Sequence, residues 1–192
     1  IYLFSAYKTY GPHQGIMVIR EELGRLLPNQ AHWFNADTLY KRFTPAGPDH
    51  AQVAASAGMA DYYDALAGHH GIGGDAAART SGVHDLFRAH ESELLQPVLD
   101  FLSDRNSVRL IGPRMAPEKA PTVAMELPGP GEDAAAKLAG HGIMAGGGDF
   151  YGSRPLQAMG VDLKKGVLRL SFVHYTTKAE VDQFLTALDD VI

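Results

Sequence analysis

The chain has 192 residues, of which 45% are hydrophobic and 20% charged, as is typical of a soluble globular protein. Its net charge of -5 comes from interspersed acidic and basic residues without a lysine- and arginine-rich stripe, so nucleic-acid binding is not expected. No apolar run approaches the length of a membrane span, and the lack of cysteine excludes disulfides and thiolate chemistry. The lack of cysteine also suits the reducing cytoplasm, where we expect the protein to be located.

The first apolar run, residues 1–4, predicts a buried strand that ends shortly before Lys8. Hydroxyl groups, an imidazole and a Gly11-Pro12 turn surround this lysine in the sequence. A partly desolvated lysine at the end of a strand can act as a nucleophile, whereas an ordinary surface lysine is the alternative. Because residue 1 already lies inside an apolar run, with no initiator methionine and no signal peptide, we expect a piece of a longer protein.

The rest of the first half predicts two short elements, a long ordered loop and a helix. In chain order these are a buried strand over residues 16–19, a helix over 21–27, a loop over 29–47 and a helix over about 49–67. Gly47 is an acceptable cap for this last helix, and Pro48 fits its first turn. The glycine-rich residues 68–74 follow and mark the best candidate for a domain boundary.

The second half predicts an alternation of helices and strands. In chain order these are a helix over residues 76–103, strands over 108–111 and 122–127, a helix over 132–139, an extended piece over 149–151, a helical turn over 155–159, a strand over 167–173 and a helix over 177–191. Pro97 is expected to kink or split the long helix. Thr177 and Glu180 have the spacing of a capping box. The glycine run 146–148 lacks the spacing of a phosphate loop and is interpreted as a flexible loop.

These elements predict an α+β or α/β protein with two domains, residues 1–68 and residues 69–192. The second domain should contain an antiparallel or mixed sheet with helices on one face. Within its strand over 167–173, Arg169 interrupts an apolar run and therefore needs an anionic partner. Either a carboxylate ligand or a structural ion pair meets that need. The nine histidines have no metal-ligand spacing, so no metal site is expected.

Two motifs together carry a resemblance to a known family. Ser5-x-x-Lys8-x-x-Gly11-Pro12 near one end and Arg169-x-Ser171-x-x-His174-Tyr175-x-Thr177-x-x-Glu180-Val181 near the other resemble the class V aminotransferases. These are fold-type I pyridoxal phosphate enzymes, and the sequence here is most similar to the cysteine desulfurase-like subfamily. The resemblance covers the whole chain. It implies that residues 1–68 are the C-terminal part of the large cofactor-binding domain and residues 69–192 the complete small domain.

The resemblance also implies a role for individual residues. Lys8 matches the lysine that holds pyridoxal 5'-phosphate as a Schiff base and then moves the substrate proton. Ser5 matches a serine on the cofactor phosphate, and Tyr7 occupies the place of a histidine on the same phosphate. Arg169 matches the arginine that binds the substrate α-carboxylate. His50 lies on a loop that reaches the neighbouring subunit's site and can touch the partner's phosphate.

The implied protein is therefore a pyridoxal-phosphate-dependent transferase or lyase that acts on an amino acid as a homodimer with shared sites. Persulfide-forming desulfurase activity is not expected, because neither residues 143–159 nor the rest of the chain contains a cysteine. The fragment alone is expected to be inactive. Two alternatives remain: a non-catalytic interaction or dimerisation module with relic site residues, and a phosphate-binding hydrolase that uses His13 or His50.

Overall fold

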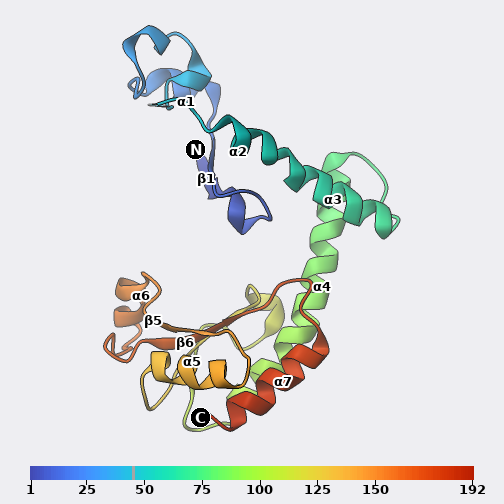
Figure 1. The fold of residues 1–192 in the computed structure, drawn as a ribbon, viewed down its shortest axis with the longest axis vertical. Helices are drawn as coiled ribbons and strands as arrows, with labels where there is room; N and C mark the ends of the chain where they lie inside the picture. Colours follow the sequence, from blue (N-terminus) through green and yellow to red (C-terminus); the bar gives the residue numbers. More distant parts are fainter. Residues whose placement is uncertain (45) are drawn as a thin grey trace. The chain divides into compact units, whose positions relative to one another are not determined.

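The computed structural model describes residues 1–44 and 46–192, which form two compact units, residues 1–83 and residues 84–192 (Figure 1). The two units part inside the helix α4 (Ala76–Ser103). The predicted domain boundary between residues 68 and 69 stays a prediction. None of the described helices combines the length and the apolar character that a bilayer crossing requires.

The first unit begins with a two-stranded antiparallel hairpin. Strand β1 (Tyr2–Ser5) pairs with β2 (Gly15–Val18), so both predicted strands are present. Their predicted burial is wrong, since Tyr2 and Leu3 are 68% and 66% exposed. Within the described residues the two strands pair only with each other, and therefore no further strand shields their apolar side chains. An apolar run reports a preference for burial but not what covers it.

Short helices follow the hairpin. They are α1 (Glu21–Leu26), the 3-10 turns η2 (Trp33–Asn35) and η3 (Leu39–Lys41), α2 (His50–Ala55) and α3 (Ala57–His69). The single helix predicted over 49–67 is thus divided at Ser56. The predicted cap at Gly47 is wrong because Asp49 caps α2, with its side chain accepting a hydrogen bond from the Gln52 amide. A carboxylate satisfies a free helix amide, whereas glycine has no side chain to do so.

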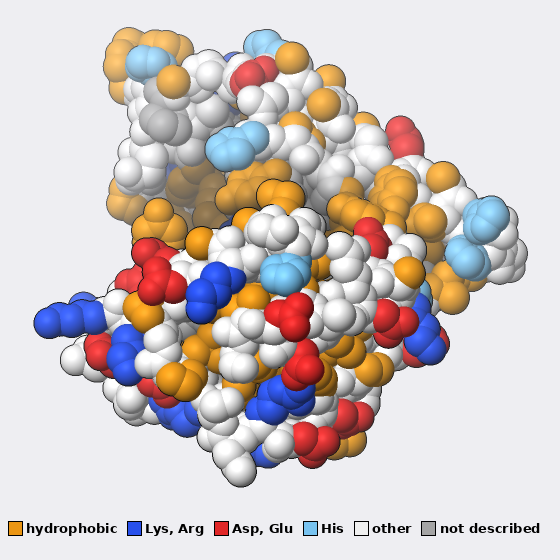
Figure 2. Space-filling model, turned by 60° about the horizontal axis from the view of Figure 1, so that its bottom comes forward, with side chains coloured by type: hydrophobic (Ala, Val, Ile, Leu, Met, Phe, Trp, Pro, Cys, Tyr) orange, Lys and Arg blue, Asp and Glu red, His pale blue; other side chains and the backbone are white. Residues whose placement is uncertain are grey.

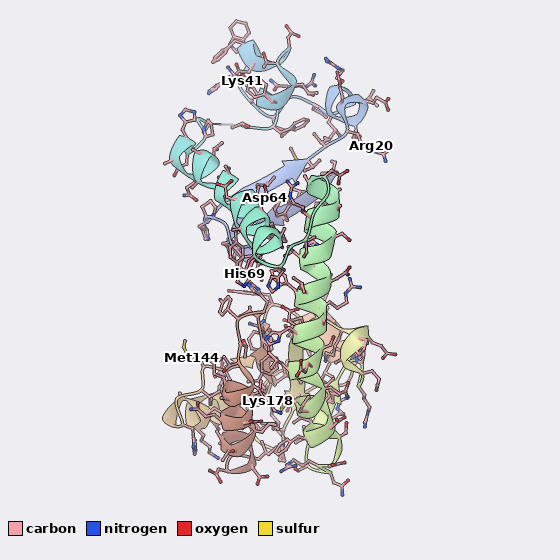
Figure 3. All side chains as sticks on the ribbon, turned by 90° about the vertical axis from the view of Figure 1, so that its right-hand side faces the viewer. Arg20, Lys41, Asp64, His69, Met144 and Lys178 are labelled. Carbon is pink, nitrogen blue, oxygen red and sulfur yellow. The ribbon has the colours of Figure 1, made fainter. Side chains whose placement is uncertain are left out.

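Helix α4 runs through Pro97 as one element, so the predicted split does not occur. Pro97 is exposed, whereas its neighbours Leu95 and Val98 are buried. The proline ring therefore lies on the solvent side and leaves the packed side of the helix intact. At the other end of α4, the Arg79 guanidinium lies 2.8 Å from the carboxylate of Asp64 on α3, which is labelled in Figure 3.

The second unit contains a four-stranded sheet in the order β3-β4-β6-β5, with every neighbouring pair antiparallel. The strands are β3 (Arg109–Ile111), β4 (Thr122–Glu126), β5 (Gly146–Gly148) and β6 (Val167–Ser171). The α+β class is thereby confirmed. Strand β5 corrects the interpretation of 146–148 as a flexible loop. The extended piece predicted over 149–151 is also wrong, since Phe150 and Tyr151 form a turn with φ of 52° and 58°.

The main core lies between one face of this sheet and the helices α4, α5 (Gly131–Gly140) and α7 (Lys178–Asp189). Its buried side chains include Leu99, Leu138, Leu168, Leu170, Phe184 and Leu188. A smaller cluster of Leu156, Val161 and Val167 forms beside α6 (Ser153–Ala158). Figure 1 shows α5 and α6 on opposite sides of β5 and β6. The prediction that helices cover one face of the sheet was therefore incomplete. Side chains alternate along β6, so Val167 faces away from Leu168 and is covered by a separate cluster.

Glycines allow the backbone of α5 to approach the sheet closely. A Cβ atom at Gly147 would lie 2.3 Å from the backbone nitrogen of Glu132, and one at Gly131 would lie 2.4 Å from the carbonyl carbon of Val167. A side chain at either glycine would require a backbone shift, because the opposing atoms belong to the backbone. The glycine strand is therefore a packing feature rather than a flexible connection.

The predicted capping box at the start of α7 is confirmed. The Thr177 hydroxyl accepts a hydrogen bond from the Glu180 amide at 3.2 Å, and the Glu180 carboxylate accepts one from the Thr177 amide at 2.7 Å. These reciprocal bonds satisfy two amides that a helix start leaves free. On the surface, Figure 2 shows acidic and basic side chains interspersed on the visible face rather than gathered in one patch.

Candidate active site

Lys8 ends the 3-10 turn η1 (Ala6–Lys8), which follows directly on β1. Its side chain is exposed, and its Nζ lies 5.6 Å from the ring centroid of Tyr7. Of the two alternatives considered from the sequence, the structure shows the surface lysine, since β1 itself is largely exposed. Lys8 therefore combines a backbone that the turn holds in place with a solvent-exposed amine.

The Lys8 turn is held together by the carbonyl oxygen of Ala6. This oxygen accepts hydrogen bonds from the Thr9 amide at 2.8 Å, the Gly11 amide at 2.9 Å and the Thr9 hydroxyl at 2.9 Å. The Ala6 amide in turn donates to the Gln14 carbonyl at 2.7 Å, and the Ala6 side chain is fully buried. Several bonds converging on one buried residue make the turn a rigid support for the lysine.

The turn also packs against helix α3. The Thr9 hydroxyl lies 3.3 Å from the Met59 sulfur, and a Cβ at Gly11 would lie 2.4 Å from that same sulfur. Glycine at position 11 thus makes room for the methionine side chain. Tyr10 has a φ of 66°, and the centroid of its ring lies 5.4 Å from that of the Tyr62 ring.

Ser5 and Tyr7 add two hydroxyl groups to the turn that carries Lys8. Ser5 is half-buried immediately before η1, and its hydroxyl forms no hydrogen bond within residues 1–44 and 46–192. Tyr7 is exposed and stacks on His13, with ring centroids 4.9 Å apart and 5° between the planes. An amine, a free serine hydroxyl and a phenol hydroxyl form a donor set that fits a phosphate-bearing aldehyde such as pyridoxal phosphate.

His50 is the first residue of α2 and is exposed. It lines a cavity of about 440 Å³ whose described lining also includes His32, Tyr40 and Lys41 but not Lys8. Figure 3 shows Lys41 on the segment between α1 and α2. Beside His50, a hydrogen bond from the Gln52 amide lowers the pKa of Asp49. The cavity therefore brings two imidazoles and an ammonium group together.

Arg169 lies in the middle of β6, paired with Ala124 of β4 and with Gly146 of β5. Its side chain is exposed, and its guanidinium carbon lies 4.0 Å from the ring centroid of Phe150. Among the described residues no carboxylate lies within 4.0 Å of this guanidinium. The structural ion pair considered from the sequence is therefore not found there, and the charge of Arg169 is not neutralised.

Phe150 is the neighbour of Arg169 that sequence reasoning missed. It belongs to a turn in which the Asp149 carboxylate accepts hydrogen bonds from the Ser153 hydroxyl at 2.6 Å and from the Tyr151 amide at 3.1 Å. These bonds lower the pKa of Asp149, the Ser153 bond contributing most. The available signal was Asp149 itself, because an aspartate side chain commonly accepts a hydrogen bond from the backbone two residues on and so favours a turn over an extended piece.

The predicted site residues thus fall in both units. Lys8, Ser5, Tyr7 and His50 belong to the first unit and Arg169 to the second. Lys8, Ser5 and Tyr7 come together on one turn, whereas His50 lines a separate described cavity. An open amine and an unneutralised guanidinium are the two groups in this set with the clearest capacity to bind a carbonyl and a carboxylate.

The Aminotransferase class-V family matches residues 67–184, which is more than half of the chain. The chain therefore belongs to the class-V aminotransferases, and the resemblance stated from the two motifs is confirmed. Among curated proteins, it is 26% identical over 196 residues to the aminotransferase-like protein FGM3 of Gibberella zeae. That match includes 100% of this chain and 46% of the relative.

Solved structures show the same fold. The cysteine desulfurase CsdA of Escherichia coli matches 99% of the chain with a TM-score of 0.73 at 21% identity. A cysteine desulfurase of Thermococcus onnurineus NA1 also matches 99% of the chain, with a TM-score of 0.71 at 22% identity. The chain covers 45% and 46% of these two proteins, respectively. It thus spans a little under half of the length of the relatives that it resembles.

Proposed function

We propose that this chain is the C-terminal part of a pyridoxal-phosphate-dependent enzyme that acts on an amino acid. Membership of the class-V aminotransferases supports the proposal. The observation that carries it is Arg169, an exposed guanidinium on a sheet strand that pairs with no carboxylate among the described residues. A cation that no carboxylate neutralises is available to an anionic ligand, and its planar fork suits the carboxylate of an amino acid.

In this proposal, Lys8 holds the cofactor through its amine and later carries a proton at Nζ. Its exposed side chain and rigid turn support this role, because a fixed backbone positions a reactive amine. The hydroxyls of Ser5 and Tyr7 donate hydrogen bonds to the cofactor phosphate. When bound, pyridoxal phosphate supplies the electron sink that stabilises negative charge at the substrate Cα.

The larger assembly is part of the same proposal. Residues 1–68 complete a cofactor-binding domain whose other residues lie outside this chain, and residues 69–192 form the small domain. The enzyme works as a homodimer in which His50 contributes to the phosphate site of the neighbouring subunit. Its imidazole lines a cavity that also contains His32 and Lys41, which supports a role in binding an anion. No persulfide carried by this chain is proposed, because it has no cysteine.

The test is a visible absorption spectrum of the full-length protein that carries this chain, with added cofactor, followed by borohydride reduction and peptide mapping. We expect a yellow protein and a pyridoxyl mass on the peptide that contains Lys8. The variant Lys8→Ala should lose both, whereas Lys164→Ala, which removes an exposed lysine in the other unit, should keep both. A colourless protein without label would contradict the catalytic proposal and favour an interaction module.

The role of Arg169 needs its own variant. Arg169→Gln should weaken amino-acid binding, measured by the change of the cofactor spectrum, by about 100-fold because a charge-assisted bidentate contact is lost. Arg154→Gln is the matched control, since Arg154 is an exposed arginine on the nearby helix α6. Equal affinities in both variants would contradict the assignment of Arg169.

A further inference from the structure

The ring of Phe150 fills a space that strand β5 leaves empty. β5 is an edge strand, and its first residue, Gly146, lies directly opposite Arg169. A Cβ atom at Gly146 would lie 2.8 Å from the Phe150 ring. The ring therefore covers the glycine on the edge strand and stands beside Arg169 on the same face of the sheet. An aromatic ring over a strand glycine stabilises the pairing at that position.

Three independent features fix the position of this ring. The backbone of Phe150 is left-handed, with φ of 52°, and the preceding Asp149 caps the turn through its bonds to Ser153 and to the Tyr151 amide. The ring also packs against the small cluster that contains Leu156 and Val167. A non-glycine residue in this conformation persists only where its surroundings hold it. Phe150 is thus a rigid surface rather than a mobile side chain.

Arg169 lies with its guanidinium carbon 4.0 Å from the centroid of this ring. The attraction is weak in comparison with an ion pair, and it acts between the charge of the guanidinium and the face of the ring. The guanidinium carries five N–H donors, and an aromatic ring satisfies them far less fully than a carboxylate does. The ring can therefore restrict the rotamers of Arg169 without neutralising its charge or occupying all of its N–H donors.

We propose that Phe150 is a positioning residue for Arg169, which it holds in the orientation that receives a substrate carboxylate. The inference rests on the proposed function of Arg169. A free arginine side chain loses rotamer entropy when it binds a ligand, and an arginine already held on a ring loses less. A carboxylate partner in the same place would hold the side chain equally well but would compete with the substrate.

The test compares two reagents that displace the Lys8 amine from the cofactor, aminooxyacetate with a carboxylate and methoxyamine without one. The ratio of their rate constants, followed by the cofactor spectrum of the full-length protein, measures the contribution of the carboxylate contact. Phe150→Leu keeps an apolar cover over Gly146 but lacks the ring, and we expect it to lower this ratio by about 3- to 10-fold. Phe150→Tyr should restore the ratio, and Arg169→Gln should lower it further.

A second measurement is independent of the cofactor reaction. In NMR spectra of the same protein, the Arg169 Nε–H signal should carry a ring-current shift that is present in Phe150→Tyr and absent in Phe150→Leu. The absence of such a shift in the unaltered protein would overturn the stacking on which the inference depends.

The outcomes separate the two proposals. If Phe150→Leu leaves the ratio unchanged while Arg169→Gln lowers it, Phe150 is only a cover for the glycine and the proposed function stands. The same conclusion holds if Phe150→Leu slows both reagents equally. If Arg169→Gln leaves the ratio unchanged, the assignment of Arg169 to the substrate is wrong, and the positioning role of Phe150 falls with it.

Discussion

His174 stacks on Phe87, with ring centroids 3.9 Å apart and 15° between the planes. The stack packs the segment between β6 and α7 against helix α4. Close by, Nε2 of His90 on α4 lies 2.9 Å from the carbonyl oxygen of Thr176. Burial and the neighbouring His90 both lower the pKa of His174, burial contributing more. The second unit thus holds an imidazole with a lowered pKa at a contact between helix α4 and the segment before α7.

We expect the free energy of unfolding to fall as the pH falls through about 6.5, the ordinary pKa of histidine. Below that pH the unfolded chain binds a proton at His174 more readily than the folded one, so acid favours unfolding until the lower, folded pKa is passed. His174→Phe keeps a ring on Phe87 and should show a smaller loss in urea unfolding between about pH 7.5 and 5.5. His141→Gln, at an exposed histidine, should behave like the unaltered protein.

Glu91 contributes a pH dependence of the opposite sign. Burial raises the pKa of its carboxyl group, so its folded form holds a proton longer than the unfolded form does. Its contribution to stability is present at low pH and is lost as the pH rises past about 4.3 and through the higher, folded pKa. The two slopes have opposite signs, and the difference between the unaltered protein and His174→Phe isolates the histidine. Identical slopes in these two proteins would contradict the prediction.

The capping box gives a prediction for helix α7. Thr177→Ala removes the hydroxyl that accepts from the Glu180 amide, and we expect a loss of about 1 kcal/mol in the free energy of unfolding. Thr186→Ala is a matched control on the same helix, because the exposed Thr186 bonds only the Asp182 carbonyl among the described residues. This control should change stability by less than about 0.5 kcal/mol. Equal effects would show that the cap contributes nothing specific.

Strand β5 gives a prediction about packing. Gly147→Ala places a methyl group 2.3 Å from the backbone of α5, so the helix must move away from the sheet. We expect a destabilisation of about 3 kcal/mol, at the upper end of overpacking effects, in chemical denaturation. Gly129→Ala is the control, since a Cβ there meets nothing within 4 Å. A small effect at position 147 would mean that the close approach of α5 is not required.

The Lys8 turn gives a prediction about local rigidity. Thr9→Val removes the hydroxyl that donates to the Ala6 carbonyl and lies 3.3 Å from the Met59 sulfur. We expect the Thr9 and Gly11 amides to exchange with deuterium about 5-fold faster, which corresponds to the loss of one hydrogen bond of about 1 kcal/mol. Thr38→Val, at a half-buried threonine in the same unit, should leave these amides unchanged. If the amide exchange rates are unchanged in Thr9→Val, the Thr9 hydroxyl does not stabilise the turn.

Patterns carried by side chains predicted the second unit well. The alternation of apolar residues along 167–173 identified β6, and the Thr177-x-x-Glu180 spacing identified the start of α7. Both signals are local, because each residue pair acts within one element. The α+β class followed from the order of such elements. The division at Ser56 of the helix predicted over 49–67 was missed because the alanine-rich sequence on both sides favours a continuous helix.

Features set by tertiary contacts were not predicted. The triplet 146–148 has no side chains and hence no period, and it pairs as a strand because α5 presses close to it. Likewise, the exposure of Lys8 depends on which segments cover β1, and an apolar run in the sequence does not indicate which segments these are. In the candidate site, Lys8 and Arg169 were identified by motif. Phe150 was missed because its contact with Arg169 depends on a left-handed turn.

The glycine strand also determines where this protein can acquire a different ligand preference. Gly147 is locked by the backbone of α5, Gly148 has φ of 126° with Gly166 pressed against it, and Gly146 lies under the Phe150 ring. A side chain at Gly146 or Gly147 requires a shift of its neighbours, and one at Gly148 strains a backbone with positive φ. Directed evolution of a new substrate range near Arg169 should therefore randomise Tyr151, which is fully exposed, and leave Phe150 and the strand unaltered.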